Sequence, residues 1–253
     1  MIDVHCHLLP GIDDGPSDVA EALNLCRLMV ANGITHAVAT PHIHLGRWDN
    51  TEQSISTAYD TLCTAIRNQK IPLQLGMAAE GRIDAEILPL LAMQQIPMLG
   101  RWLLDGVDYQ VMLLELPHNQ VPPGSDKLIA WLKTRNILAM IAHPERNKGF
   151  QRNVDKLEPF IAAGCLFQLT AASVVGGFGD AAQELADWML DQRLATLLAT
   201  DAHNDKGRRP LLAEARAHVA SLYDEQYANL LVQQNPQRLV AEQFDSLRGF
   251  GEL

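Results

Sequence analysis

Several apolar, strand-like segments of this sequence end in residues that commonly bind metals, and this recurrence is its most informative feature. Parallel strands buried on both faces appear as apolar runs, and barrel enzymes carry their chemistry at the carboxyl ends of such strands. We therefore expect these side chains to converge in space. The six segments are Asp3-Val4-His5-Cys6-His7, Ala39-Thr40-Pro41-His42, Met77-Ala78-Ala79-Glu80, Leu113-Leu114-Glu115, Ile141-Ala142-His143-Pro144-Glu145-Arg146 and Ala199-Thr200-Asp201-Ala202-His203, with Asp13-Asp14-Gly15 after the first.

The first segment places two imidazoles on one side of a strand. Side chains alternate along a strand, so His5 and His7 point to one face and Cys6 to the other. A single histidine at a strand end is more often a hydrogen-bonded structural residue than a ligand. Six strand ends of this kind together favour a metal site, and imidazoles combined with carboxylates suit Mn²⁺, Zn²⁺ or Fe.

Length and composition indicate one globular domain. The chain has 253 residues, 47% of them hydrophobic, which suits a single α/β barrel over residues 1–253. The net charge of -10 argues against general binding of nucleic acid. No apolar run approaches the roughly eighteen residues of a membrane helix, and the N-terminus does not resemble a signal peptide, so we expect no membrane insertion and a cytoplasmic location.

The four cysteines carry no Cys-x-x-Cys pairing. Their spacing agrees with a reducing compartment, in which buried thiols act as small hydrophobic side chains. None of them begins a Cys-x₅-Arg phosphate loop, which excludes a thiol-based tyrosine phosphatase.

Strands and helices alternate along most of the sequence. Seven strands separated by helices predict an incomplete or distorted barrel rather than eight full units. The predicted strands cover 1–6, 34–40, 72–79, 110–115, 137–142, 165–169 and 195–200. The predicted helices cover 18–32, 51–69, 124–135, 153–163 and 180–193, followed by a helical tail at 209–221, 224–234 and 236–246.

Taken together, these motifs resemble the PHP (polymerase and histidinol phosphatase) superfamily. The resemblance rests on Met1 to His7, Gly11 to Pro16, Thr40-Pro41-His42, Glu80-Gly81-Arg82-Ile83, Ala142 to Arg146 and Thr200 to Asn204. Within the superfamily the sequence is most similar to the bacterial metal-dependent protein-tyrosine phosphatases of capsular and exopolysaccharide systems. The likeness runs in order from residue 1 to about residue 210.

This resemblance implies a distorted (β/α)₇ barrel with a trinuclear centre and extra C-terminal helices. One ion would bind His5, His7, Glu80 and Asp201; a second would share Glu80 and bind Glu115 and His143; a third would bind Asp14, His42 and His203. Arg146 and Arg208 match the phosphate-binding arginines of the family. The implied cofactors are three divalent ions, Mn²⁺ first, with Fe, Zn, Co or Mg as alternatives.

The implied reaction is hydrolysis of phosphotyrosine by a metal-bound hydroxide. The implied partner is the tail of a bacterial tyrosine autokinase that regulates polysaccharide export. Two alternatives remain open from the sequence: a small-molecule phosphoesterase such as a histidinol-phosphate phosphatase, and a non-catalytic metal-binding module. Residues 45–50 depart most from the family pattern, and with His44 and His118 they are expected at the rim of the site.

Overall fold

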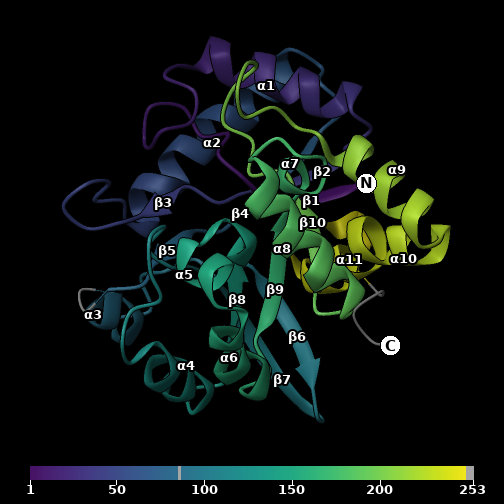
Figure 1. Ribbon diagram of the computed structural model, residues 1–253. Helices are drawn as coiled ribbons and strands as arrows, with labels where there is room; N and C mark the ends of the chain where they lie inside the picture. The colour runs from purple at the N-terminus through teal and green to yellow at the C-terminus, as the bar shows by residue number, and fades with distance from the viewer. Residues whose placement is uncertain (85–86, 249–253) are drawn as a thin grey trace.

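Seven parallel strand positions form the centre of the fold, and helices surround them (Figure 1). The structure is a computed structural model that describes residues 1–84 and 87–248. The seven positions are β1 (Ile2–Cys6), β2 (His36–Ala39), β4 (Gln74–Met77), β7 (Val107–Glu115), β8 (Ile137–Ala142), β9 (Leu166–Thr170) and β10 (Leu197–Ala199). Each corresponds to one of the seven predicted strands, so the predicted barrel class is confirmed.

The barrel is distorted because its strands divide into two hydrogen-bonded sheets. One sheet has the order β1-β2-β4, and the other has the order β10-β9-β8-β7-β5-β3, where β3 is His42–Ile43 and β5 is Glu80–Arg82. These two short strands continue β2 and β4 in unchanged register, with Ala39 opposite Met77 and His42 opposite Glu80. A single bridge between Cys6 and Ala202 joins β1 to the end of β10.

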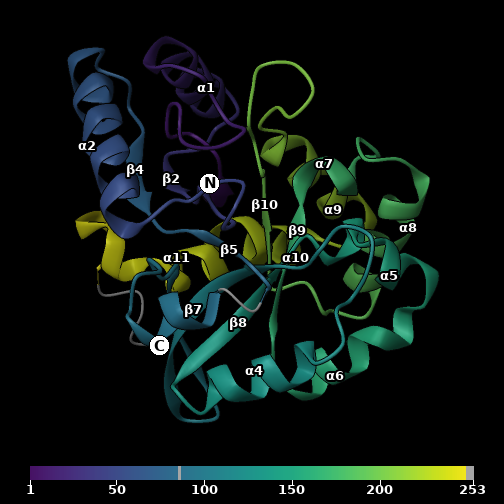
Figure 2. The ribbon, with the colours of Figure 1, turned by 90° about the vertical axis from the view of Figure 1, so that its left-hand side faces the viewer.

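The opening between β4 and β7 is filled by the C-terminal segment. Gln243 accepts a hydrogen bond from the Met77 amide (2.9 Å) and donates one to the Leu99 carbonyl (2.7 Å), which links both sides of the opening. A Cβ atom on Gly100 would lie 1.8 Å from the Leu239 carbonyl oxygen, so only glycine permits this approach. Figure 2 shows the yellow C-terminal helices passing between the two groups of strands.

A hairpin beside this opening was not predicted. β6 (Gly100–Leu104) pairs antiparallel with β7 through a turn at Asp105 and Gly106, which have φ of 51° and 77°. Two successive positive φ values mark the tight hairpin turn for which Asp-Gly is a preferred sequence. β7 consequently begins at Val107 rather than at residue 110.

The helices follow the predicted alternation, with differences at the C-terminus. The helix predicted at 224–234 is α10 (Glu225–Asn229) followed by a π-helical turn at Leu230–Gln234. The prediction of a helix at 236–246 is wrong beyond Leu239, because two 3₁₀ turns follow there. In this segment Gln243 forms a hydrogen bond with the Met77 amide of β4. α3, α5 and α7 were not predicted. The α-helices are α1 (Val19–Ala31), α2 (Glu52–Asn68), α3 (Ile87–Ala92), α4 (Ser125–Lys133), α5 (Lys148–Arg152), α6 (Glu158–Ala162), α7 (Ala171–Val174), α8 (Asp180–Asp191), α9 (Leu212–Leu222), α10 (Glu225–Asn229) and α11 (Asn235–Leu239).

A bulge in β1 turns its histidines toward the site. Ile2 and Val4 belong to the hydrophobic cluster of inward-facing strand residues, whereas Cys6 belongs to the cluster shared with the helices. Strict alternation would put all three on one face, but the pairing register shifts between Asp3 and Cys6. The shift sends Cys6 outward and leaves His5 and His7 facing the interior.

Candidate metal centre

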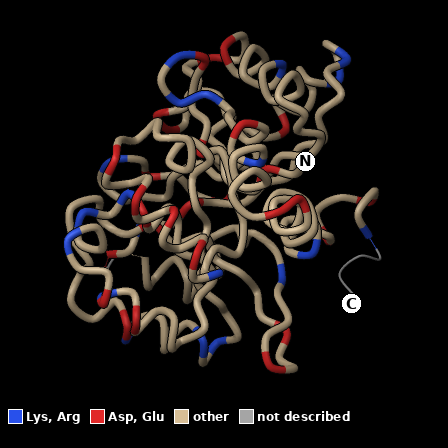
Figure 3. The backbone as a smooth tube through the Cα atoms, turned by 45° about the vertical axis from the view of Figure 1, so that its right-hand side comes forward, with Lys and Arg blue, Asp and Glu red and all other residues tan. Residues whose placement is uncertain are grey.

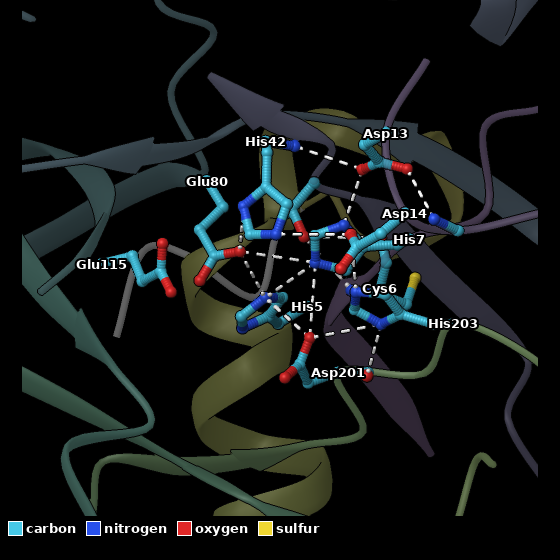
Figure 4. Close-up of polar contacts among 12 residues, drawn as sticks. His5, Cys6, His7, Asp13, Asp14, His42, Glu80, Glu115, Asp201 and His203 are labelled. Atoms are coloured by element: carbon cyan, nitrogen blue, oxygen red, sulfur yellow. Dashed lines mark hydrogen bonds and ion pairs between the residues drawn. The ribbon is translucent and has the colours of Figure 1, made fainter. Parts of the chain in front are cut away.

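The structure brings all nine predicted metal-ligating residues together at the carboxyl ends of the strands. Figure 4 labels all of them except His143. They supply four overlapping groups of donor atoms, each group lying within 4.8 Å. The groups are His7, Asp14, His42 and His203; His5, His143 and Asp201; His5, His7 and Glu80; and His42, Glu80 and Glu115. Because the groups share members, ions bound to them would be close neighbours. The division of the residues among three ions stays a prediction.

Two of these residues have a strained backbone. His143 follows β8 with φ of 33°, and Asp201 follows β10 with φ of 51°. Residues other than glycine rarely adopt this left-handed region, and such strain gathers at functional sites. At His143 and Asp201 this conformation ends the strand direction of the backbone, and both side chains lie in the cluster.

Three of the imidazoles are oriented by hydrogen bonds to one ring nitrogen. His5 Nδ1 lies 2.7 Å from Gln168 Oε1, His7 Nδ1 lies 2.7 Å from Asp13 Oδ2, and His203 Nδ1 lies 2.9 Å from the Asp201 carbonyl oxygen. A proton on Nδ1 leaves Nε2 as the free donor atom, which is how metal-ligating histidines are commonly fixed.

The sequence analysis did not assign roles to Gln168 or Asp13. Gln168 is fully buried on β9, the one predicted strand whose end carries no metal-type residue. Its signal was a lone polar residue inside the apolar run Leu166-Phe167-Gln168-Leu169. Asp13 lies beside the predicted ligand Asp14 and points its carboxylate to His7 and to the His42 amide.

Two fully buried carboxylates of the cluster, Asp201 and Glu80, are held in the charged form. Burial alone would raise the pKa of Asp201, but Arg208, His5 and Arg146 lower it well below its usual range. Burial likewise opposes ionisation of Glu80, and His5 and His42 reverse the effect, so its pKa is lowered well below its usual range. Burial, together with the nearby His7, lowers the pKa of His203 to about 4. Charged carboxylates and a neutral imidazole are the forms that ligate metal.

Unsatisfied polar atoms show that the residues fit divalent cations. Glu80 Oε2, Asp201 Oδ1, His42 Nδ1 and His203 Nε2 are buried and make no hydrogen bond within the described residues. Their nearest contacts are ion pairs, with His42 Nδ1 3.0 Å from Glu80 Oε2 and His203 Nε2 3.1 Å from Asp14 Oδ1. Buried polar atoms without hydrogen bonds are costly, and cations at this position would satisfy all four. Oxygen and imidazole donors without thiolate suit Mn²⁺, Fe or Zn²⁺. Glu115 also accepts a hydrogen bond from Arg82 (2.8 Å) through Oε2.

Both predicted phosphate-binding arginines reach the cluster. Arg146 and Arg208 each donate to Asp201 Oδ2, and their side chains are 15% and 25% exposed. The Nε atom of each guanidinium is buried without a hydrogen-bond partner. Two largely buried cations with spare donors, converging beside a metal-ligating set, make a site for an oxyanion.

The predicted rim residues lie at different distances from the chemistry. Trp48 pairs with His44 through the backbone, and its indole stacks on His42 with centroids 4.6 Å apart and planes inclined by 10°. His118 lines a small cavity together with Glu115, His143 and Arg146. Trp48 therefore covers His42, a predicted ligand, and His118 borders the predicted ligands Glu115 and His143.

A barrel with such a centre at the carboxyl ends of its strands is of the PHP type, as the sequence motifs indicated. The family described as "Capsular polysaccharide synthesis, CpsB/CapC" matches residues 1–241. The chain therefore belongs to this family, and the predicted resemblance is confirmed.

Named relatives support the same assignment. The chain is 33% identical to the tyrosine-protein phosphatase YwqE of Bacillus subtilis over 208 residues, covering 82% of this chain and 79% of YwqE. It is 25% identical to the tyrosine-protein phosphatase CpsB of Streptococcus pneumoniae over 252 residues, covering 96% and 99%. A solved structure from a study of YwqE and CpsB, described as metal-dependent tyrosine phosphatases, matches with a TM-score of 0.86 and 30% identity over 96% of each chain.

More distant structures share the fold alone. Organophosphorus hydrolase from Deinococcus radiodurans superposes with a TM-score of 0.55 at 13% identity, over 93% of this chain and 90% of that one.

Among residues 1–84 and 87–248, no helix is long and apolar enough to cross a membrane. Figure 3 shows Lys and Arg positions dispersed among more numerous acidic ones, in keeping with the net charge of -10.

Proposed function

We propose that this protein is a metal-dependent protein-tyrosine phosphatase, a phosphoric monoester hydrolase. The observation that carries the proposal is the convergence of Arg146 and Arg208 on Asp201, within a cluster of nine metal-type side chains. Cations and arginines together match the charge of a phosphate monoester, and the named relatives are tyrosine phosphatases.

Three divalent ions, Mn²⁺ in the first place, are the proposed cofactors, held by the nine residues of the cluster. When bound, such ions supply Lewis-acid stabilisation of the phosphoryl oxygens and lower the pKa of a coordinated water toward neutrality. The protein's part is to keep the carboxylates of Asp14, Glu80 and Asp201 charged and to present imidazole Nε2 atoms, which Gln168 and Asp13 arrange at His5 and His7.

Arg146 and Arg208 hold and balance the phosphoryl group. Negative charge spreads over the phosphoryl oxygens in the transition state, and a fixed guanidinium stabilises it without reorganisation. Both side chains are largely buried, so water screens their charge only weakly. Tyrosine leaves as a phenolate whose conjugate acid has a pKa of about 10, so no dedicated general acid is required.

The proposed substrate is a phosphotyrosine-containing protein, in particular the tyrosine-rich tail of an autokinase that acts in polysaccharide export, and the proposed location is the cytoplasm. The family's description in terms of capsular polysaccharide synthesis supports this setting. The acidic surface disfavours nucleic acid as a partner.

The test compares kcat/KM for three substrates on one Mn²⁺-loaded preparation: a phosphotyrosine peptide, the matched phosphoserine peptide and histidinol phosphate. The proposal expects the phosphotyrosine peptide to be hydrolysed fastest. If kcat/KM for histidinol phosphate is higher by orders of magnitude, the protein is a small-molecule phosphoesterase instead. Turnover of no phosphate ester by the loaded protein would leave only a metal-binding module.

A further inference from the structure

One aromatic side chain near the site lies outside the hydrophobic core. Phe178 is half-buried, but it belongs to neither hydrophobic cluster of the described residues, whereas nearby Val175 packs against the larger one. Its ring faces the guanidinium of Arg146, whose Cζ atom lies 4.2 Å from the ring centroid. The Phe178 ring therefore contacts Arg146, a proposed phosphate-binding residue.

Backbone hydrogen bonds and two glycines with positive φ define the loop that carries Phe178. Gly176 and Gly179 have φ of 81° and 83°, and amide hydrogen bonds run from Gly176 to Ser173 (3.1 Å), from Gly177 to Ala172 (2.7 Å) and from Gly179 to Gly176 (3.1 Å). The segment connects α7, which follows β9, to α8, and can be followed in Figure 2. Phe178 thus lies between two glycines with positive φ, and its ring contacts the Arg146 guanidinium.

We propose that Phe178 is a specificity-determining residue, forming the wall of the site against which the aromatic ring of the leaving group packs. This inference rests on the proposed phosphatase function. The tyrosyl ring is joined to the phosphoryl group through one oxygen, so it lies beside the guanidinium that holds that group. Phe178 is the aromatic side chain in contact with Arg146. Pairs of aromatic rings attract beyond simple burial, and a serine phosphate has no ring to place there.

Trp48 is a second half-buried aromatic outside both clusters, and it serves as a comparison. Its indole is already occupied by His42, at 4.6 Å, and by Arg47, whose Cζ atom lies 4.0 Å from the ring centroid. Loss of Trp48 should therefore disturb a proposed metal ligand and weaken aryl and alkyl ligands alike.

The experiment measures binding of two non-hydrolysable anions, phenylphosphonate and methylphosphonate, to Mn²⁺-loaded protein by calorimetry. Phe178→Leu is expected to weaken phenylphosphonate about 3- to 10-fold, the range for one aromatic pair, and to leave methylphosphonate unchanged. Phe178→Tyr should keep the preference. Trp48→Leu should lower both affinities in proportion. The parallel kinetic expectation is a fall in kcat/KM for a phosphotyrosine peptide with none for the matched phosphoserine peptide.

Equal weakening of both phosphonates by Phe178→Leu would overturn the proposal, because it would mean that the ring only positions Arg146. Unchanged affinity for both would overturn it as well. The melting temperature of each variant checks folding, and Phe178→Tyr provides a second test if the leucine variant unfolds. If binding of phenylphosphonate depends on Phe178 but phosphotyrosine is not hydrolysed, the proposed function fails while the aryl wall stands.

Discussion

Replacing Gln168 by leucine tests whether hydrogen bonds beyond the ligand set hold the metal centre together. Gln168 and His5 are both fully buried, and Gln168 Oε1 lies 2.7 Å from His5 Nδ1. Leucine removes the acceptor and leaves a buried ring N–H without a partner, which costs about 1–3 kcal/mol. Leucine also removes Gln168 Nε2, which is itself buried without a hydrogen-bond partner among the described residues, so we expect about 1–2 kcal/mol, the lower part of that range.

That loss predicts two measurements on Gln168→Leu. In metal-free protein, about 1–2 kcal/mol corresponds to a fall in melting temperature of roughly 2–8 °C for a chain of this size. Affinity for the ions bound through His5 should fall about 10–100-fold, as observed when a partner of a ligating histidine is lost. Calorimetric Mn²⁺ titration and differential scanning calorimetry give the two values.

Two variants control this experiment. Gln168→Glu keeps an oxygen acceptor at the same place, so Mn²⁺ affinity should be retained. Gln192→Leu makes the same chemical change at an exposed position after α8, where neither quantity should move. Wild-type Mn²⁺ affinity and melting temperature in Gln168→Leu would refute the idea that this hydrogen bond fixes the His5 ring.

Three further predictions follow from the site. Chelation should abolish phosphatase activity and Mn²⁺ should restore it; full activity in verified metal-free protein would contradict the mechanism. Arg146→Ala and Arg208→Ala should each lower kcat/KM about 10–10³-fold while metal content, measured by atomic emission, is unchanged. Burial raises the pKa of Cys26 and of Cys165 to about 12, so at pH 8 both stay as thiols. Iodoacetamide should therefore alkylate them in unfolded protein only, which mass spectrometry would show. Replacement of Cys6, Cys26, Cys63 or Cys165 by Ser should leave turnover largely intact.

The sequence predicted the strands, and the convergence of the candidate ligands, because both depend on local chemistry. The buried parallel strands are apolar runs, and their carboxyl ends meet at one face, so Glu80, His143 and Asp201 could be brought together without knowing the register. The helix predicted at 51–69 is α2, whose buried residues Ile55, Ala58, Leu62 and Ile66 recur at helical spacing.

What the sequence did not predict depends on contacts between distant segments. Gln168 orients His5 across 163 residues, and Gln243 bridges Met77 and Leu99 at the opening of the barrel. No spacing rule connects such positions. The turn at Asp105 and Gly106 was different, since its Asp-Gly pair between alternating residues is a local hairpin signal that was overlooked.

Charge explains why this site should need its cations before it can bind substrate. Four proposed ligands are carboxylates (Asp14, Glu80, Glu115 and Asp201), and the pKa values of Asp14, Glu80 and Asp201 are lowered despite burial, so they stay ionised. Arg146 and Arg208 both form ion pairs with Asp201, so part of their positive charge is already neutralised within the protein. Burial opposes protonation of His5 and His7, but Glu80 and Asp201 raise the pKa of His5, and Asp13 raises that of His7. Two imidazolium rings and two guanidinium groups then offset the carboxylates, so the metal-free site offers a phosphate dianion no net positive charge. Divalent ions bound there would displace the imidazole protons and add positive charge, so metal loading and phosphate affinity should rise together in a titration of phenylphosphonate binding against Mn²⁺. Equal phenylphosphonate affinity in metal-free and loaded protein would show that the arginines alone suffice.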